Sequence, residues 1–137
     1  MQIERHEKQY HTSAHLVYSC QYHVIFCPKY RRKVLTGEIE KRLSEIIASV
    51  AQTYQFEIIE QEIMPDHVHL IVDVNPRFGI MEAVKKLKGI SSQTLRKEFP
   101  SLRSRLPSLW TRSAFISSVG AVTLEIVKRY IEEQKGK

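Results

Sequence analysis

The chain has 137 residues, 42% of them hydrophobic, and carries a net charge of +6 at pH 7. This length allows one domain with a single core and excludes a second. No run of about 18 uninterrupted apolar residues occurs, and Met1 to Lys8 lack the apolar segment of a signal peptide. We therefore expect one domain over 1–137, located in the cytoplasm and without membrane contact. The basic excess favours an anionic partner.

The first half of the chain predicts a strand, a helix and a hairpin. After an N-terminal extension over 1–15, alternating apolar positions predict a strand over 16–27, which Pro28 ends. Apolar residues at helical spacing predict a helix over 38–54. Strands are expected over 56–64 and 67–74, and the Pro65-Asp66 turn between them indicates an antiparallel hairpin.

The second half predicts a helix over 80–97 that Pro100 ends, then a linker and a last strand over 110–117. A terminal helix over 121–135 follows, with Gly120 as a hinge before it. The order β-α-β-β-α-β indicates an α+β fold with a ferredoxin-like antiparallel sheet, helices on one face and an extra C-terminal helix. The other sheet face is then free to meet the terminal helix.

Two histidines share one face of the strand that follows the Pro65-Asp66 turn. Because strand side chains alternate, Val68 and Leu70 can enter a core while His67 and His69 project together from the opposite face. Two neutral imidazoles held in this way can chelate a divalent metal. A His-x-His pair alone is more often structural, so further ligands are needed. Asp66 has two equally good interpretations. It can be a turn residue, or it can orient one of the histidine ligands.

Basic residues form two groups that could follow a phosphate backbone. One group comes directly after the first strand, and the other can share one side of the second long helix. The predicted DNA-contacting residues are Lys29, Arg31, Arg32, Lys33, Lys85, Lys88 and Arg96.

On the terminal helix, Tyr130 and Gln134 are four residues apart and share one face. Together with the segment Pro65 to Leu70, which contains the His pair, this pattern resembles the HUH single-tyrosine transposases. These are the small TnpA-type enzymes of insertion sequences that move as single-stranded DNA. Matching segments at 22–31 and 84–89, and Leu109-Trp110 ahead of Val119-Gly120, extend the resemblance over about 18–134.

The resemblance implies that Tyr130 is the catalytic nucleophile and forms a 5′-phosphotyrosine link. His67, His69 and Gln134 would be the metal ligands, and such a mixed nitrogen and oxygen set suits Mg²⁺ or Mn²⁺. No nucleotide cofactor is expected, because the bond energy is kept in the phosphotyrosine. The implied partners are single-stranded DNA with hairpin ends and a second copy of the chain. In that homodimer the active sites are shared between subunits, with Gly120 as the hinge.

Two alternatives stay open. A domesticated relative would cut repeated hairpins in a genome with the same active site and without moving its own gene. A basic protein that binds single-stranded nucleic acid without catalysis would use the His pair and Tyr130 only for packing.

Overall fold

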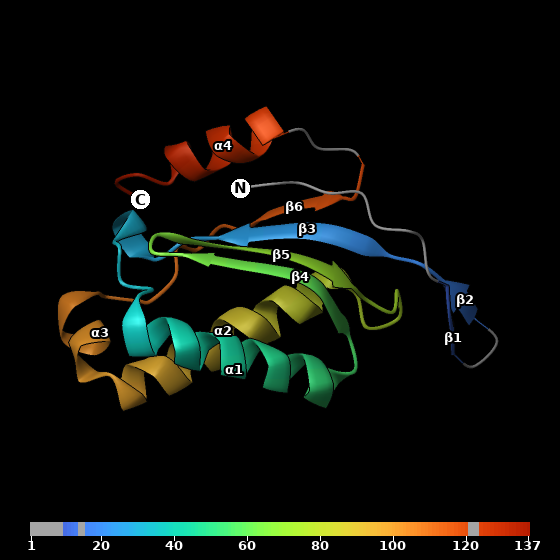
Figure 1. Cartoon of the computed structure of the whole chain (residues 1–137), viewed down its shortest axis with the longest axis horizontal. Coiled ribbons are helices and arrows are strands. Elements are labelled where there is room, and N and C mark those ends of the chain that lie inside the picture. The colour runs from blue at the N-terminus through green and yellow to red at the C-terminus, as the bar shows by residue number, and fades with distance from the viewer. Residues whose placement is uncertain (1–9, 14–15, 121–123) are drawn as a thin grey trace.

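A four-stranded antiparallel sheet, ordered β4-β5-β3-β6, lies at the centre of the protein (Figure 1). The computed structural model describes residues 10–13, 16–120 and 124–137. The strands of this sheet are β3 (Gln21–Phe26), β4 (Glu57–Met64), β5 (His67–Asp73) and β6 (Phe115–Ser118). A separate two-stranded sheet pairs β1 (His11–Ser13) with β2 (Leu16–Tyr18).

Helices lie on both faces of the central sheet. On one face α1 (Gly37–Tyr54) packs beside α2 (Ile80–Glu98), and α4 (Leu124–Glu133) lies over the other face (Figure 1). Two short helices, η1 (Lys29–Arg31) and α3 (Pro100–Arg105), complete the described elements. No helix in the described part of the chain is long and apolar enough to cross a membrane.

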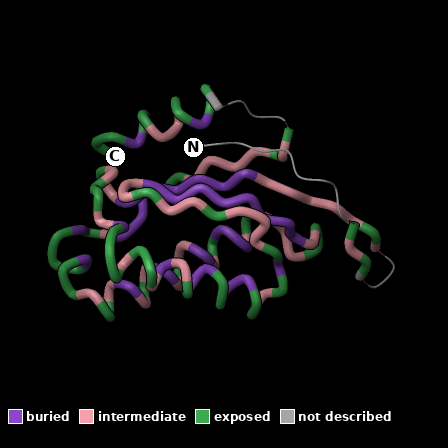
Figure 2. Tube along the Cα trace, viewed as in Figure 1, coloured by how far each residue is buried: buried purple, intermediate pink, exposed green. Residues whose placement is uncertain are grey.

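The hydrophobic core lies between the sheet and the helix pair α1 and α2. Alternate residues of the central strands face these helices and are fully buried, among them Val24 and Phe26 on β3 and Leu70 on β5. Apolar side chains at helical spacing cover them from α1 and α2, namely Leu43, Ile46, Ile47, Val50, Val84, Leu87 and Leu95. Figure 2 shows both central strands buried over most of their length. Because β5 is buried at every residue, its second face must be covered as well.

The predicted fold class and element order are confirmed. The chain follows β-α-β-β-α-β through β3, α1, β4, β5, α2 and β6, with α4 after them. The hairpin of β4 and β5 is antiparallel, as the Pro65-Asp66 turn predicted. Within the described residues, each of the two long predicted helices begins and ends within one position of the expected boundary.

The strand predicted over 16–27 is two strands, so that prediction was wrong in its extent. β2 pairs with β1, whereas β3 belongs to the central sheet. The break falls at Cys20, whose backbone N–H donates to the Asp73 side chain and whose carbonyl accepts from Val74. These bonds end the central ladder. β1 lies inside the predicted extension and had no strong local signal, because it has only 3 residues.

The region between α2 and α4 differs from the prediction in two further ways. The expected linker contains α3, which Pro100 begins and whose Leu102 is buried. The last strand begins at Phe115 instead of Trp110, which forms only an isolated bridge to Pro28. Pro28 has no backbone N–H with which to continue a ladder. The predicted start of the terminal helix at 121–123 lies outside the described residues.

The buried hydrogen bond between Trp110 and Ser91 gives a test of the packing. The indole Nε1 donates to the Ser91 hydroxyl at 3.0 Å, and both residues are buried. Ser91→Ala leaves this N–H without its partner, so we expect the free energy of unfolding to fall by about 1–3 kcal/mol in urea denaturation. The exposed Ser49→Ala on α1 is the control, with an expected change within about 0.5 kcal/mol. Equal losses in the two variants would contradict the assignment.

Candidate active site

His67 and His69 lie on the face of β5 that points away from α1 and α2. Both side chains are buried, with 9% and 4% of their surface exposed. Their β5 neighbours Val68 and Leu70 belong to the hydrophobic core. The alternation predicted from the sequence therefore puts the two imidazoles on the same face, beneath α4 rather than in the core.

Asp66 determines which nitrogen of His67 carries the proton. The Asp66 carboxylate lies 2.8 Å from Nδ1 of His67. Since a carboxylate only accepts, Nδ1 carries the proton and the lone pair is on Nε2. The Nε2 atom is buried and has no hydrogen-bond partner among the described residues. A buried lone pair with the opposite ring nitrogen held by a carboxylate is the arrangement of a metal-ligating histidine.

His69 lies beside a third histidine, His23 on β3. Nε2 of His69 is 3.0 Å from Nδ1 of His23, and the two rings stack with centroids 5.2 Å apart. Burial, followed by the neighbouring His23, lowers the pKa of His69 to about 4. His69 is therefore neutral at physiological pH, which is the form that binds metals.

Sequence reasoning missed His23, although a signal was present. The neighbouring residues Tyr22, Val24 and Phe26 all pack in or against the core, so alternation along β3 puts His23 on the same sheet face as the His pair. The sequence did not show that β3 and β5 are neighbours in the sheet, which is what brings His23 beside His69.

Ser113 joins Tyr130 to Gln134. Its hydroxyl oxygen lies 3.1 Å from the Tyr130 hydroxyl and donates to Oε1 of Gln134, also at 3.1 Å. Because Ser113 has a single hydroxyl proton, the Tyr130 O–H is the donor in the first of these bonds. Burial raises the pKa of Tyr130 above its usual value, so the phenol is protonated at neutral pH. Nothing in the local sequence pointed to Ser113.

The candidate residues therefore form two groups. The side-chain hydrogen bonds given for Tyr130 and Gln134 go to Ser113, while those given for His67 and His69 go to Asp66 and His23. Both side chains reach Ser113, although Gln134 is not within the helix on which the sequence placed it. Gln134 is buried, with 3% of its surface exposed, and lies just beyond the end of α4.

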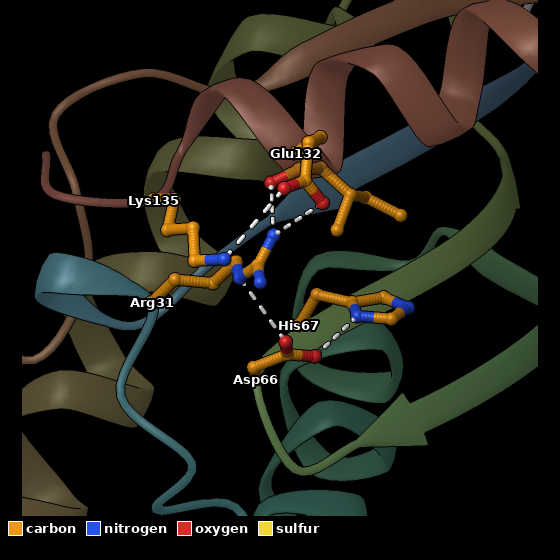
Figure 3. A network of polar contacts seen from close by, with 6 residues as sticks. Arg31, Asp66, His67, Glu132 and Lys135 are labelled. Carbon is orange, nitrogen blue, oxygen red and sulfur yellow. Dashed lines mark hydrogen bonds and ion pairs between the residues drawn. The ribbon is translucent and has the colours of Figure 1, made fainter.

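Arg31 connects the two groups (Figure 3). Its Nε lies 3.2 Å from Oδ2 of Asp66, whose other oxygen binds His67. Its Nη1 lies 3.2 Å from Oε2 of Glu132 and donates to the backbone carbonyl of Ile131 at the same distance. The guanidinium thus holds the C-terminal end of α4, where a helix carries partial negative charge. The metal-ligand candidate His67 is tied to the tyrosine helix through Asp66 and Arg31.

Lys88 supports the segment that carries Ser113. Its ammonium donates to the carbonyls of Thr111 at 2.7 Å and Ser113 at 3.0 Å. Burial lowers its pKa from the usual value. Lys88 was predicted to contact DNA, and in this structure it fixes the loop before β6.

The other residues predicted to contact DNA differ in their surroundings. The guanidinium of Arg96 donates to the carbonyls of Leu106 and Pro107, and Lys29 lies over the ring of Tyr30. The predicted contacts that are exposed to solvent are Arg32, Lys33 and Lys85.

The chain is similar to known transposases over most of its length. The family model described as "Transposase IS200 like" matches residues 16–134. The ISDra2 transposase TnpA of Deinococcus radiodurans is 39% identical over 123 residues, which cover 88% of each chain. The transposase for insertion sequence element IS200 of Salmonella typhimurium is 31% identical over 127 residues, 89% of this chain and 84% of the relative. A crystal structure of a candidate transposase from Deinococcus radiodurans R1 aligns with a TM-score of 0.85 and 32% identity, covering 93% of this chain and 99% of that one.

The lowered pKa of His69 predicts a pH-dependent stability of the metal-free protein. Between pH 6.5 and about 4 the unfolded state binds a proton that folded His69 does not, so the free energy of unfolding falls as the pH falls. This contribution is at most about 3 kcal/mol and levels off below pH 4. Urea denaturation in EDTA across this pH range measures it. His69→Gln should flatten that part of the profile, and identical profiles for the two proteins would disprove the assignment.

Proposed function

The chain belongs to the IS200-like transposase family, and on this premise we propose that it cuts and rejoins single-stranded DNA at insertion-sequence ends, with Tyr130 as the nucleophile. DNA cleavage and strand transfer are the activity of a transposase. The observation that carries the choice of site is the buried Nε2 of His67, which lacks a hydrogen-bond partner among the described residues while Asp66 holds Nδ1. A metal ion explains a nitrogen in this state.

His67, His69 and Gln134 would hold Mg²⁺ or Mn²⁺. Two imidazole nitrogens and one amide oxygen form a mixed ligand set that these ions accept. When bound, the ion would stabilise the negative charge that develops on the scissile phosphate. Asp66 fixes the ring orientation of His67, and burial keeps His69 neutral.

In the cleavage step, Tyr130 Oη forms a bond to phosphorus and the bond from phosphorus to the 3′ oxygen breaks. The phenol proton leaves Tyr130, and the departing 3′ oxygen gains a proton, which gives a 5′-phosphotyrosine and a free 3′-hydroxyl. Attack by another 3′-hydroxyl on the phosphotyrosine reverses these bond changes and joins two strands. Because its pKa is raised, Tyr130 needs a proton acceptor during attack.

Catalysis requires α4 to move in this proposal. Ser113 binds both Tyr130 and Gln134 in the conformation described, and in this proposal Gln134 leaves Ser113 to join His67 and His69. Gly120, with a φ of +94° that favours glycine, supplies a hinge on the route to α4. We propose that α4 completes the His site of a second chain in a homodimer.

The DNA partner would be single-stranded with hairpin ends, held through its phosphates. Arg32, Lys33 and Lys85 are exposed and free to follow a phosphate backbone. Arg31 and Lys88 would act on the site instead, since their donor groups already hold α4 and the Ser113 loop.

Tyr130→Phe is the direct test of the nucleophile. The variant keeps the ring that packs on Phe115 and lacks the attacking oxygen, so the covalent product should fall below detection. Wild-type and variant protein are incubated with single-stranded hairpin DNA from the sequence flanking the gene, with Mn²⁺ or EDTA, and resolved on a denaturing gel. The exposed Tyr10→Phe is the matched control and should form the adduct as the wild type does. An adduct of equal yield with Tyr130→Phe would refute the assignment, and binding without an adduct in any protein would favour the non-catalytic alternative.

Asp66→Ala tests how His67 is oriented. Loss of a carboxylate that positions a metal-ligating histidine weakens metal binding about 10–100-fold, so the Mn²⁺ concentration for half-maximal cleavage should rise by that factor. Glu132→Gln is the matched control, because it removes an ion pair of Arg31 and leaves the bond between Asp66 and His67 in place. If the two variants required the same Mn²⁺ concentration, Asp66 would have no specific effect on the metal site.

A further inference from the structure

A second group of metal-ligand side chains lies at the opposite end of β5 from His67. It combines Asp73, the last residue of β5, with Glu57 at the start of β4 and His11 on β1. Nε2 of His11 is 3.1 Å from Oδ2 of Asp73 and 3.4 Å from Oε2 of Glu57. The three ligand atoms all lie within 4.8 Å of one another. Since a strand rises about 3.4 Å per residue, this cluster is about 20 Å from His67.

The two carboxylates are placed against each other by the sheet register. Glu57 and Asp73 are directly opposite across the antiparallel pair of β4 and β5. Like charges at such positions destabilise a sheet. The Asp73 side chain is 1% exposed, so water screens its charge poorly. Within the described residues, the ion pairs given for both carboxylates are with His11. A single imidazole therefore faces two negative charges.

Neighbouring groups hold the ligand side chains in place. The backbone N–H of Cys20 donates to Oδ1 of Asp73 at 3.1 Å, which leaves Oδ2 turned toward His11. The ring of Tyr18 stacks on the His11 imidazole with centroids 5.1 Å apart, which fixes the plane of the imidazole. Contacts of this kind around a ligand set are what orients it for a metal.

Two of the three spacings between the ligand atoms match those around a single ion. Ligands about 2.1 Å from a metal, and about 90–110° apart around it, are separated by about 3.0–3.4 Å. The two distances from His11 fall at these values. Zn²⁺ takes imidazole and carboxylate ligands, and a set of three protein ligands leaves its fourth position to water.

We propose that His11, Glu57 and Asp73 bind one Zn²⁺ ion per chain, which fastens the hairpin of β1 and β2 to the end of the central sheet. The ion neutralises the opposed carboxylates and links β1 to the hairpin of β4 and β5, which begins more than 40 residues later in the chain. Its role is structural and does not involve Tyr130 or the His67 pair.

Zn²⁺ titration calorimetry on the full chain tests the proposal. Zn²⁺ can also bind at His67 and His69, so the wild type should bind two ions, and His11→Ala or Glu57→Gln should reduce this to one. His67→Ala/His69→Ala should keep the His11 ion. Thr12→Ala, an exposed change on β1, is the matched control and should bind as the wild type does. The expected loss of affinity at the His11 site is about 100-fold or more.

The outcomes separate this site from the proposed active site. A wild type that binds one ion, lost on His11→Ala, would support the His11 site and count against the His67 site. Zn²⁺ binding that is unchanged in both His11→Ala and Glu57→Gln would overturn the proposal and leave His11 as an ion-pair partner.

Hydrogen exchange of the hairpin of β1 and β2 tests whether the ion fastens it to the sheet. Zn²⁺ should slow this exchange in the wild type and leave it unchanged in His11→Ala. No slowing in the wild type would overturn the structural role.

Discussion

The alternation of side chains along β5 is the constraint on which the rest of the structure depends. Because neighbouring strand residues point to opposite faces, Val68, Leu70 and Val72 can fill the core only if His67 and His69 enter the other face. A register shift of one residue would turn both imidazoles toward α1 and α2 and expel three core residues. The stability of the core and the placement of the candidate metal ligands are therefore consequences of the same strand pattern.

The second face of the sheet carries buried polar groups beside the apolar Ile25 and Ile71, and neighbouring side chains hold these polar groups. Asp66 orients His67, and His23 on the neighbouring strand contacts His69. A buried polar group that loses its partner costs about 1–3 kcal/mol, so these contacts favour a single arrangement of the rings. At the far end of the strand the same face carries Asp73, held by a backbone N–H. One strand thus positions candidate ligand sets at both of its ends.

The contacts that hold α4 combine a buried apolar side chain, hydrogen bonds and an exposed ion pair. Val127 is a fully buried apolar contact of the helix. The bond from Tyr130 to Ser113 is between neutral groups and contributes about 1 kcal/mol. Glu132, which pairs with Arg31, has 69% of its side chain exposed, so that pair adds at most about 1 kcal/mol. The proposed transfer of Tyr130 requires these contacts to break, together with the bond from Ser113 to Gln134.

By itself, the sequence determined the order of the elements, the two faces of β5 and the membership in the transposase family, because strand and helix periods and motif spacings are local properties of the chain. It did not predict α3 or the short hairpin of β1 and β2, whose local signals are weak. Only the tertiary structure decided that His23 lies beside His69, that Ser113 joins Tyr130 to Gln134, and that Arg31 reaches α4. These contacts depend on strand order and on packing between segments up to 101 positions apart, and no local pattern contains that information.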